Sequence, residues 1–137
     1  VLESLSLIEA LRQEVVRFAQ SSNIKARFDV SDNGRKLPLD IETAILRICQ
    51  ESLANIKKHA QASEVKVGLT FDKSDVVLTI RDNGVGFKTD KTDEGNGEHP
   101  GFGLMGMQER ARNLGGTFEV QSEQGEGTLV KVVIPVM

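Results

Sequence analysis

The residues best suited to chemistry lie in segment 82–87, Asp-Asn-Gly-Val-Gly-Phe, which ends the strand-like run Asp75 to Arg81. The Asp82 carboxylate can accept a hydrogen bond from an exocyclic amine. Gly84 and Gly86 lack Cβ, so the backbone there can turn and approach a flat ring closely. Alone, Asp-Asn-Gly is more typical of a turn. Together with three further polar motifs in the chain, it predicts a binding site for a flat polar ring.

A second group of polar residues lies on one face of a predicted helix from Leu39 to about His59. Glu51, Asn55, Lys58 and His59 are separated by steps of four, three and one, so they share a helix face. A solvated surface is one interpretation. The other is a site for a divalent metal and a polyphosphate: Asn55 offers a carbonyl oxygen to Mg²⁺, Lys58 a point charge for phosphate, and Glu51 a group that orients or deprotonates an attacking atom. His59, near the helix end, suits a dipole partner or a phosphate contact.

Two glycine-rich motifs follow. Residues 101–106, Gly-Phe-Gly-Leu-Met-Gly, match G-x-G-x-x-G, but a charged loop precedes them and too little chain follows for a dinucleotide-binding unit. A glycine-rich approach to a helix still leaves free N–H groups for an anion. Residues 125–128, Gly-Glu-Gly-Thr, are typical of a hairpin turn. If the sheet brings this turn beside Asp82, Thr128 can join the polar edge of the ring site.

The elements that must position these groups are predicted from hydrophobic periodicity. An apolar stripe at Leu5, Ile8, Leu11, Val15 and Phe18 indicates a first helix that ends by 21–23. The predicted order continues with strand 24–30, helix 39–59, strands 64–73 and 75–81, helix 104–114 closed by two glycines, and strands 117–122 and 128–136. Segment 88–100 is charged, almost without apolar residues, and is predicted to be a mobile loop. This order predicts an α+β, two-layer α/β sandwich with a mostly antiparallel sheet of about five strands and three helices on one face.

Composition limits the class of protein. The chain has 137 residues, 39% of them hydrophobic, which predicts a single domain over 1–137. A net charge of −3 argues against a nucleic-acid partner, and no apolar run is long enough to predict a membrane span or membrane contact. Cys49 is the only cysteine, predicted to be core, and fits a reducing cytoplasm. Because the chain opens on Val1, we expect it to be part of a longer protein.

With these motifs in place, the chain resembles the ATP-binding catalytic domain of bacterial two-component sensor histidine kinases, in the superfamily of gyrase, heat-shock chaperone, histidine kinase and mismatch-repair ATPases (GHKL). Residues 51–60 look like its N box, and 82–86, 101–106 and 125–128 look like its glycine boxes. The first helix, the run Gly106-Met-Gln-Glu-Arg-Ala and the closing Leu-Gly-Gly at 114–116 are similar to the subclass paired with NarL/LuxR-type response regulators. Ser6 stands where that subclass often has glycine.

The resemblance implies a Bergerat-type fold that binds Mg²⁺ and ATP under a mobile lid at about 88–100. Catalytic roles fall on Glu51, Lys58 and His59, with Asn55 as the Mg²⁺ ligand. The implied ATP-binding residues, from adenine to phosphates, are Asp82, Gly84, Gly86, Thr128, Asn55, Gly101, Gly103 and Leu104. The γ-phosphate would pass to a histidine on dimerisation helices outside this chain, and then to a response-regulator aspartate. The chain alone is therefore not expected to autophosphorylate. The longer protein could be anchored in a membrane.

Three alternatives remain open. An anti-sigma-type serine kinase would share the nucleotide site, and an acceptor histidine upstream of this chain would exclude it. A gyrase-like or mismatch-repair-like ATP hydrolase would use Glu51 as base for water, and turnover of ATP by this chain would favour it. A degenerate kinase that serves only as a docking surface would not bind ATP.

Overall fold

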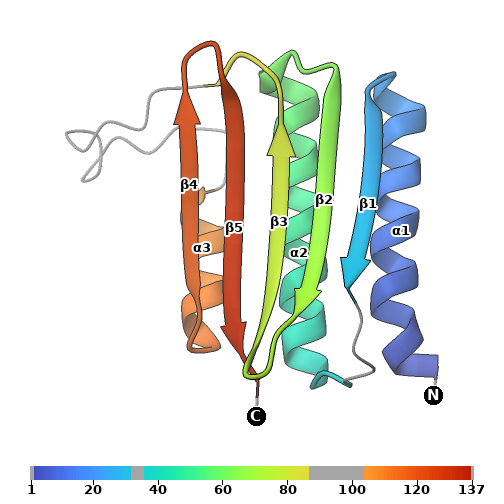
Figure 1. The fold of residues 1–137 in the computed structure, drawn as a ribbon, viewed down its shortest axis with the longest axis vertical. Coiled ribbons are helices and arrows are strands. Elements are labelled where there is room, and N and C mark those ends of the chain that lie inside the picture. Colours follow the sequence, from blue (N-terminus) through green and yellow to red (C-terminus); the bar gives the residue numbers. More distant parts are fainter. Residues whose placement is uncertain (1, 32–35, 87–103, 137) are drawn as a thin grey trace.

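The computed structural model describes residues 2–31, 36–86 and 104–136, and it contains a five-stranded sheet with helices packed on one side (Figure 1). The helices are α1 (Leu2–Ser22), α2 (Leu39–Asn55), the π-helical turn η1 (Ile56–Ala60) and α3 (Leu104–Asn113). The strands are β1 (Lys25–Ser31), β2 (Glu64–Phe71), β3 (Asp75–Asp82), β4 (Thr117–Glu123) and β5 (Gly127–Pro135). The predicted two-layer α+β sandwich is confirmed. No helix within the described ranges is both long and apolar enough to span a membrane.

The sheet is mixed, as expected, with the order β1-β2-β3-β5-β4. Only β1 and β2 pair in parallel, because α2 crosses over between them; the remaining neighbours are antiparallel. The register places Asp82, the last residue of β3, directly opposite Thr128, near the start of β5. The topology therefore joins two motifs that lie 46 positions apart in the printed sequence.

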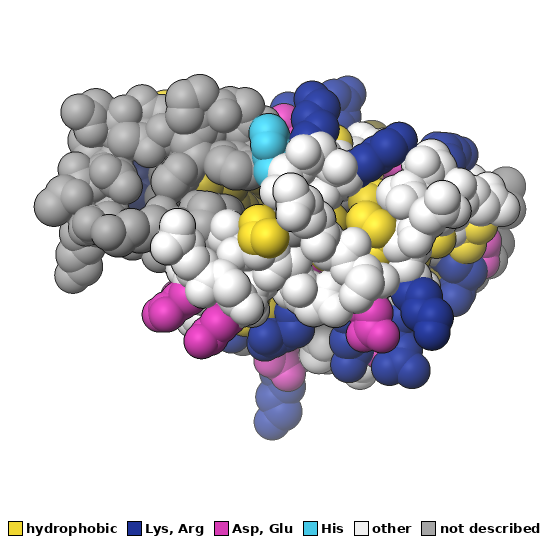
Figure 2. All heavy atoms as spheres, turned by 90° about the horizontal axis from the view of Figure 1, so that it is seen from above, with side chains coloured by type: hydrophobic (Ala, Val, Ile, Leu, Met, Phe, Trp, Pro, Cys, Tyr) yellow, Lys and Arg dark blue, Asp and Glu magenta, His cyan; other side chains and the backbone are white. Residues whose placement is uncertain are grey.

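The core lies between the helix layer and the inner face of the sheet. Side chains alternate between buried and exposed along β2 and β3, as a sheet covered on one side requires. On the opposite face, Arg27, Lys66 and Arg81 stand side by side on three adjacent strands. Lys and Arg side chains gather accordingly along the lower and right-hand part of Figure 2, and Lys66 forms an ion pair with Asp29 at 3.5 Å.

Several predicted boundaries differ from the structure. The buried stripe of α1 runs through Leu7, Leu11, Val15 and Phe18, with Ile8 only partly buried beside it. The helix predicted to continue to His59 changes at Ile56 from α to π geometry, which widens the last turn and alters which side chains share a face. Strand β2 ends at Phe71 rather than Lys73, and β1 begins at Lys25.

The predicted glycine closure of α3 is confirmed in detail. Gly115 adopts a left-handed conformation with φ of +78°. Gly116 N–H donates to the Ala111 carbonyl and Gly115 N–H to the Arg112 carbonyl, both at 2.9 Å. This pair of bonds is the Schellman arrangement that satisfies the last carbonyls of a helix. The closure sets where α3 stops and β4 begins.

Candidate nucleotide-binding site

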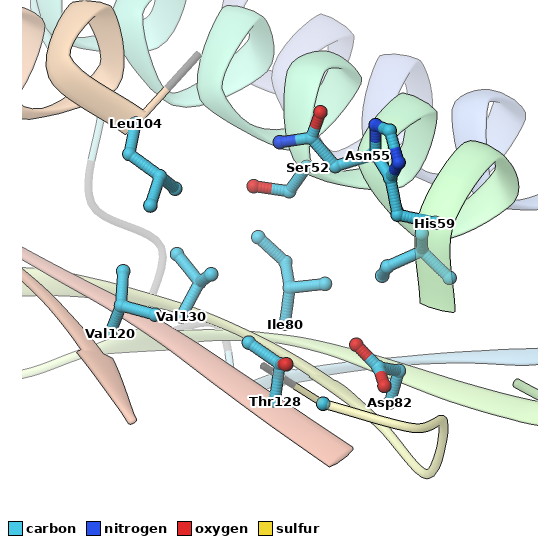
Figure 3. Close-up of a pocket in the computed structure, with 11 residues that line it drawn as sticks. Ser52, Asn55, His59, Ile80, Asp82, Leu104, Val120, Thr128 and Val130 are labelled. Carbon is cyan, nitrogen blue, oxygen red and sulfur yellow. The ribbon is translucent and has the colours of Figure 1, made fainter. Parts of the chain in front are cut away.

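A pocket opens between the helices and the inner face of the sheet, and it collects most of the predicted site residues that the structure describes (Figure 3). The sheet contributes Ile80, Asp82, Val120, Thr128 and Val130, and the helices contribute Ser52, Asn55, Ile56, His59 and Leu104. Gly86 completes the lining. An apolar cleft with a few convergent polar groups is the usual form of a small-molecule site.

Asp82 lies on the sheet side of the pocket, with its carboxylate directed towards the helices (Figure 3). It is 5% exposed, and its Oδ1 accepts a 2.8 Å hydrogen bond from the Gly84 N–H. Burial raises the pKa of Asp82 above its ordinary value, although backbone N–H groups of Gly84 and Thr128 act in the opposite direction. The net raised pKa means that desolvation outweighs the hydrogen bonds the protein itself supplies. A further hydrogen-bond donor would therefore stabilise the ionised form of the buried Asp82 carboxylate.

Thr128 and Ser122 form the polar edge next to Asp82. Their hydroxyl oxygens are 2.7 Å apart, and the Ser122 hydroxyl also donates to the Gly127 carbonyl at 3.2 Å. These bonds orient the Thr128 hydroxyl at the side of the pocket, beside Asp82 (Figure 3). The expectation that the sheet brings Thr128 to Asp82 is confirmed.

Two glycines allow the loop after β3 to lie against the β4–β5 turn. Gly86 has a φ of +68°, and a Cβ there would meet the Glu123 carbonyl oxygen at 2.1 Å. Gly127 has a φ of +83°, and its Cβ would meet the Asp82 carbonyl oxygen at 2.1 Å. Val85 accepts a hydrogen bond from the Gly125 N–H at 2.6 Å. The glycines are therefore required by a close backbone approach that shapes one wall of the pocket.

Asn83 explains why the strand ends at this point. Its side-chain oxygen accepts bonds from the Ser63 and Glu64 N–H groups, each at 2.9 Å, and its Nδ2 donates to the Ser63 hydroxyl at 2.9 Å. These contacts tie the end of β3 to the segment that precedes β2. Asn83 thus holds the chain on which the Asp82 carboxylate is displayed.

The α2 polar face divides into two parts. Asn55 and His59 line the pocket, whereas Lys58 is exposed and lies outside the lining. Glu51 is also outside the lining, and its Oε1 is 4.0 Å from the Arg110 Nε on α3. The wider turn at Ile56–Ala60 places the residues after Asn55 differently from the continuous helix that was expected.

The remaining predicted residues have different outcomes. Gly84 is buried and donates to Asp82, but it does not line the pocket. Leu104, the first residue of α3, lines it. Gly101, Gly103 and the predicted lid at 88–100 lie outside the described residues.

Cys49 is buried as expected, and burial raises the pKa of its thiol to about 12, which keeps the thiol unreactive.

The sequence interpretation missed the apolar floor of the pocket. Ile80, Val120 and Val130 lie on three neighbouring strands and form this floor (Figure 3). Strand alternation could have placed Ile80 on the same face as Asp82, two residues later in β3. Ser52, which was not among the predicted site residues, lines the pocket too, and its hydroxyl donates to the Met107 sulfur at 3.4 Å.

The described residues also limit what could hold a metal. They contain no cluster of three or more His, Cys, Asp or Glu side chains suited to a metal ion. The Asn55 side chain at the pocket offers a neutral oxygen. This fits Mg²⁺, which often takes few protein ligands and completes its shell with water and phosphate oxygens.

The fold is a two-layer α/β sandwich in which a buried carboxylate faces a cleft with an apolar floor. Residues 40–137 match the family described as histidine kinase-, DNA gyrase B- and HSP90-like ATPases, and the chain belongs to that family. Within it, the chain is an ATPase catalytic domain of the histidine kinase type. Domains of this family bind ATP, and the pocket described above is the candidate site.

Individual relatives agree with this membership. The chain is 36% identical over 135 residues to the signal transduction histidine-protein kinase/phosphatase DegS of Brevibacillus brevis, and 32% identical over 135 residues to the oxygen sensor histidine kinase NreB of Staphylococcus carnosus. Each match covers 98% of this chain but only 34% and 38% of the relative, so the chain spans about a third of those proteins.

Solved structures share the fold at lower identity. The catalytic domain of histidine kinase ThkA superposes with a TM-score of 0.76 at 18% identity, covering 94% of this chain and 91% of ThkA's. The histidine kinase AdeS of Acinetobacter baumannii gives a TM-score of 0.74 at 16% identity, covering 96% of this chain and 64% of its own.

Proposed function

We propose that this domain binds Mg²⁺-ATP and donates the γ-phosphate to a histidine on a separate dimerisation helix, for relay to a response-regulator aspartate. The observation that carries the proposal is the buried Asp82 carboxylate at the apolar pocket. Burial has raised its pKa, so a donor from a ligand is favourable there. The exocyclic amine of adenine supplies such a donor. Guanine carries a carbonyl oxygen at that position and would place two acceptors against each other.

The adenine ring occupies the pocket between the helices and the sheet. Ile80, Val130 and Ile56 contact its faces, and Thr128 hydrogen-bonds its polar edge beside Asp82. The backbone of Gly86 approaches the ring, because no Cβ intervenes there, and Gly84 supports Asp82 through its N–H. This placement follows from the lining residues: Ile80, Val120 and Val130 form an apolar floor, and Asp82 and Thr128 lie together beside it (Figure 3).

The phosphates extend from the adenine towards α2 and the start of α3. Lys58 and His59 supply positive or donor groups on that side. Leu104 begins α3, where the N-terminal N–H groups and the helix dipole favour an anion. We include Gly101 and Gly103, which directly precede this helix in the sequence, in the same phosphate site.

Asn55 is the proposed protein ligand of Mg²⁺, which would neutralise phosphate charge during transfer. If so, Asn55→Ala should remove most of the Mg²⁺ dependence of ATP affinity. Among the described residues that line the pocket, Asn55 is the only one with a side-chain amide oxygen. Calorimetric titrations of ATP with Mg²⁺ and with EDTA would measure this. Gln50→Ala, on the same helix and outside the pocket, is the control. Unchanged Mg²⁺ dependence in Asn55→Ala would identify another ligand.

Glu51 is the proposed acid–base residue. It orients or deprotonates the attacking imidazole while the bond between the γ-phosphorus and the β-phosphate oxygen breaks and ADP leaves. Glu51 lies one helical turn before Asn55 and so on the same side of α2. The partners are the dimerisation helices that carry the acceptor histidine and a regulator of the NarL/LuxR type. Similarity to DegS, NreB and the sensor histidine kinase LiaS supports a role as a histidine kinase domain. We also propose that the reaction takes place in the cytoplasm.

Calorimetry with ATP and GTP tests the proposal most directly. We expect ATP to bind more tightly than GTP, with a further gain from Mg²⁺, and no turnover by this chain alone. Equal affinity for the two nucleotides would contradict the assignment of Asp82 to adenine. Sustained release of phosphate by the isolated chain would favour an ATP hydrolase with Glu51 as base for water. The absence of binding would favour a docking module.

A further inference from the structure

Arg110 on α3 is the charged neighbour of Glu51 on α2. Its Nε lies 4.0 Å from the Glu51 Oε1. We propose that Arg110 is a positioning residue, which orients the Glu51 carboxylate, just outside the pocket lining, during phosphoryl transfer. This inference rests on the proposed function, because Arg110 acts by orienting Glu51, the proposed acid–base residue, and does not itself contact the substrate.

A second contact fixes the rotation of α3 against α2. Met107, three residues before Arg110, is fully buried, and its sulfur accepts a hydrogen bond from the Ser52 hydroxyl at 3.4 Å. Residues three apart share a helix face, so Met107 and Arg110 point together at the adjacent α2 residues Ser52 and Glu51. Ser52 itself lines the pocket (Figure 3). The buried Met107 therefore sets the direction of the more exposed Arg110.

The Glu51 Oε1 atom faces the Arg110 guanidinium without a hydrogen bond. This oxygen is buried, and no hydrogen-bond partner for it exists within 2–31, 36–86 and 104–136. The Glu51 side chain as a whole is 44% exposed, so Arg110 faces the buried end of a side chain that also reaches the surface. A carboxylate oriented from its buried end is suited to meet a reactant that approaches from outside.

The pair contributes little to the stability of the fold. The Arg110 and Glu51 side chains are 42% and 44% exposed, and half-exposed ion pairs are screened by water. A purely structural role would therefore leave both rate and melting temperature nearly unchanged on substitution. A positioning role predicts a loss of rate without a loss of stability, and this difference makes the inference testable.

The test uses the full-length protein and measures histidine autophosphorylation at varied ATP concentration. We expect Arg110→Ala to lower kcat by about 10- to 100-fold, the usual effect of misplacing a reacting group by about an ångström. KM for ATP and the melting temperature should stay as in the parent. Arg110→Lys should recover part of kcat, since it keeps the charge. Arg112→Ala, an exposed arginine in the same last turn of α3, should behave as the parent.

A double-mutant cycle with Glu51→Gln separates the outcomes. If Arg110 acts through Glu51, Arg110→Ala should add little to the loss already caused by Glu51→Gln. Additive losses, an unchanged kcat in Arg110→Ala, or a raised KM that indicates direct contact with nucleotide would each overturn the inference while leaving the proposed function intact. Failure of the parent to bind ATP or to phosphorylate a histidine would overturn both.

Discussion

Asp82→Asn is expected to weaken ATP binding by about 2 kcal/mol or more, which corresponds to roughly a 30-fold higher Kd. The substitution removes the negative charge from a side chain that is only 5% exposed, and the adenine amine then meets a weaker, neutral acceptor. Calorimetric titration of parent and variant would measure the difference. Glu64→Gln, an exposed acid on β2, is the charge-matched control, and parental affinity in Asp82→Asn would show that another group reads adenine.

The same variant should not be less stable than the parent at neutral pH. Burial raises the pKa of Asp82, so the ionised carboxylate disfavours the folded state above that pKa. The penalty decreases as the pH falls through the folded-state pKa and disappears below the ordinary value of 3.8, where Asp82 is protonated in both states. Urea unfolding should therefore show Asp82→Asn at least as stable as the parent at pH 7, with the difference shrinking in acid. A large loss of stability at pH 7 would instead indicate a structural role for the charge.

Gly127→Ala is expected to lower the free energy of unfolding by about 3 kcal/mol, since two costs combine. The residue has a φ of +83°, and the new Cβ would lie 2.1 Å from the Asp82 carbonyl oxygen and 3.1 Å from the Asn83 Cα. Both contacts are with backbone, which cannot rotate away. ATP affinity should fall as well, because Thr128 follows Gly127 and lines the pocket.

Gly125→Ala is a matched control for Gly127→Ala. Gly125 has a similar φ of +85°, but a Cβ there would meet nothing within 4 Å. Only the left-handed backbone is penalised, by about 1 kcal/mol. Urea denaturation of the two variants therefore separates strain from the close approach of the two loops. Equal losses would mean that the approach to Asp82 contributes nothing.

Much of the fold was predictable because its elements carry local signals. Alternation along β2 and β3 indicated strands with one buried face, and the Gly115-Gly116 pair indicated the end of α3. Errors arose where a local pattern allowed two solutions. In α1, Leu7 and Ile8 both continue an apolar stripe, and only the packing shows that Leu7 is the more buried. The π geometry at Ile56–Ala60 has no comparable signature in the sequence.

Part of the candidate site was also predictable from local signals in the sequence. Asp82 and Asn55 carry side chains suited to one ligand, and the structure brings both to one pocket. The apolar floor was not predicted, because Val120 and Val130 look like ordinary strand residues until the strand order places them beside Ile80. The placement of Lys58 and Glu51 outside the lining depends on helix phase and on the neighbouring α3.

The sequence by itself determined the kinds of chemistry available: one carboxylate at a strand end, an acid and an amide on a helix face, and glycines at three turns. Side-chain type and local spacing are sufficient for that. Only the tertiary structure decided which of these groups meet. The pairing of Asp82 with Thr128, the contact of Gly127 with Asp82 and the approach of Arg110 to Glu51 all join distant segments. Such contacts depend on strand order, register and helix rotation, which arise from packing the whole core.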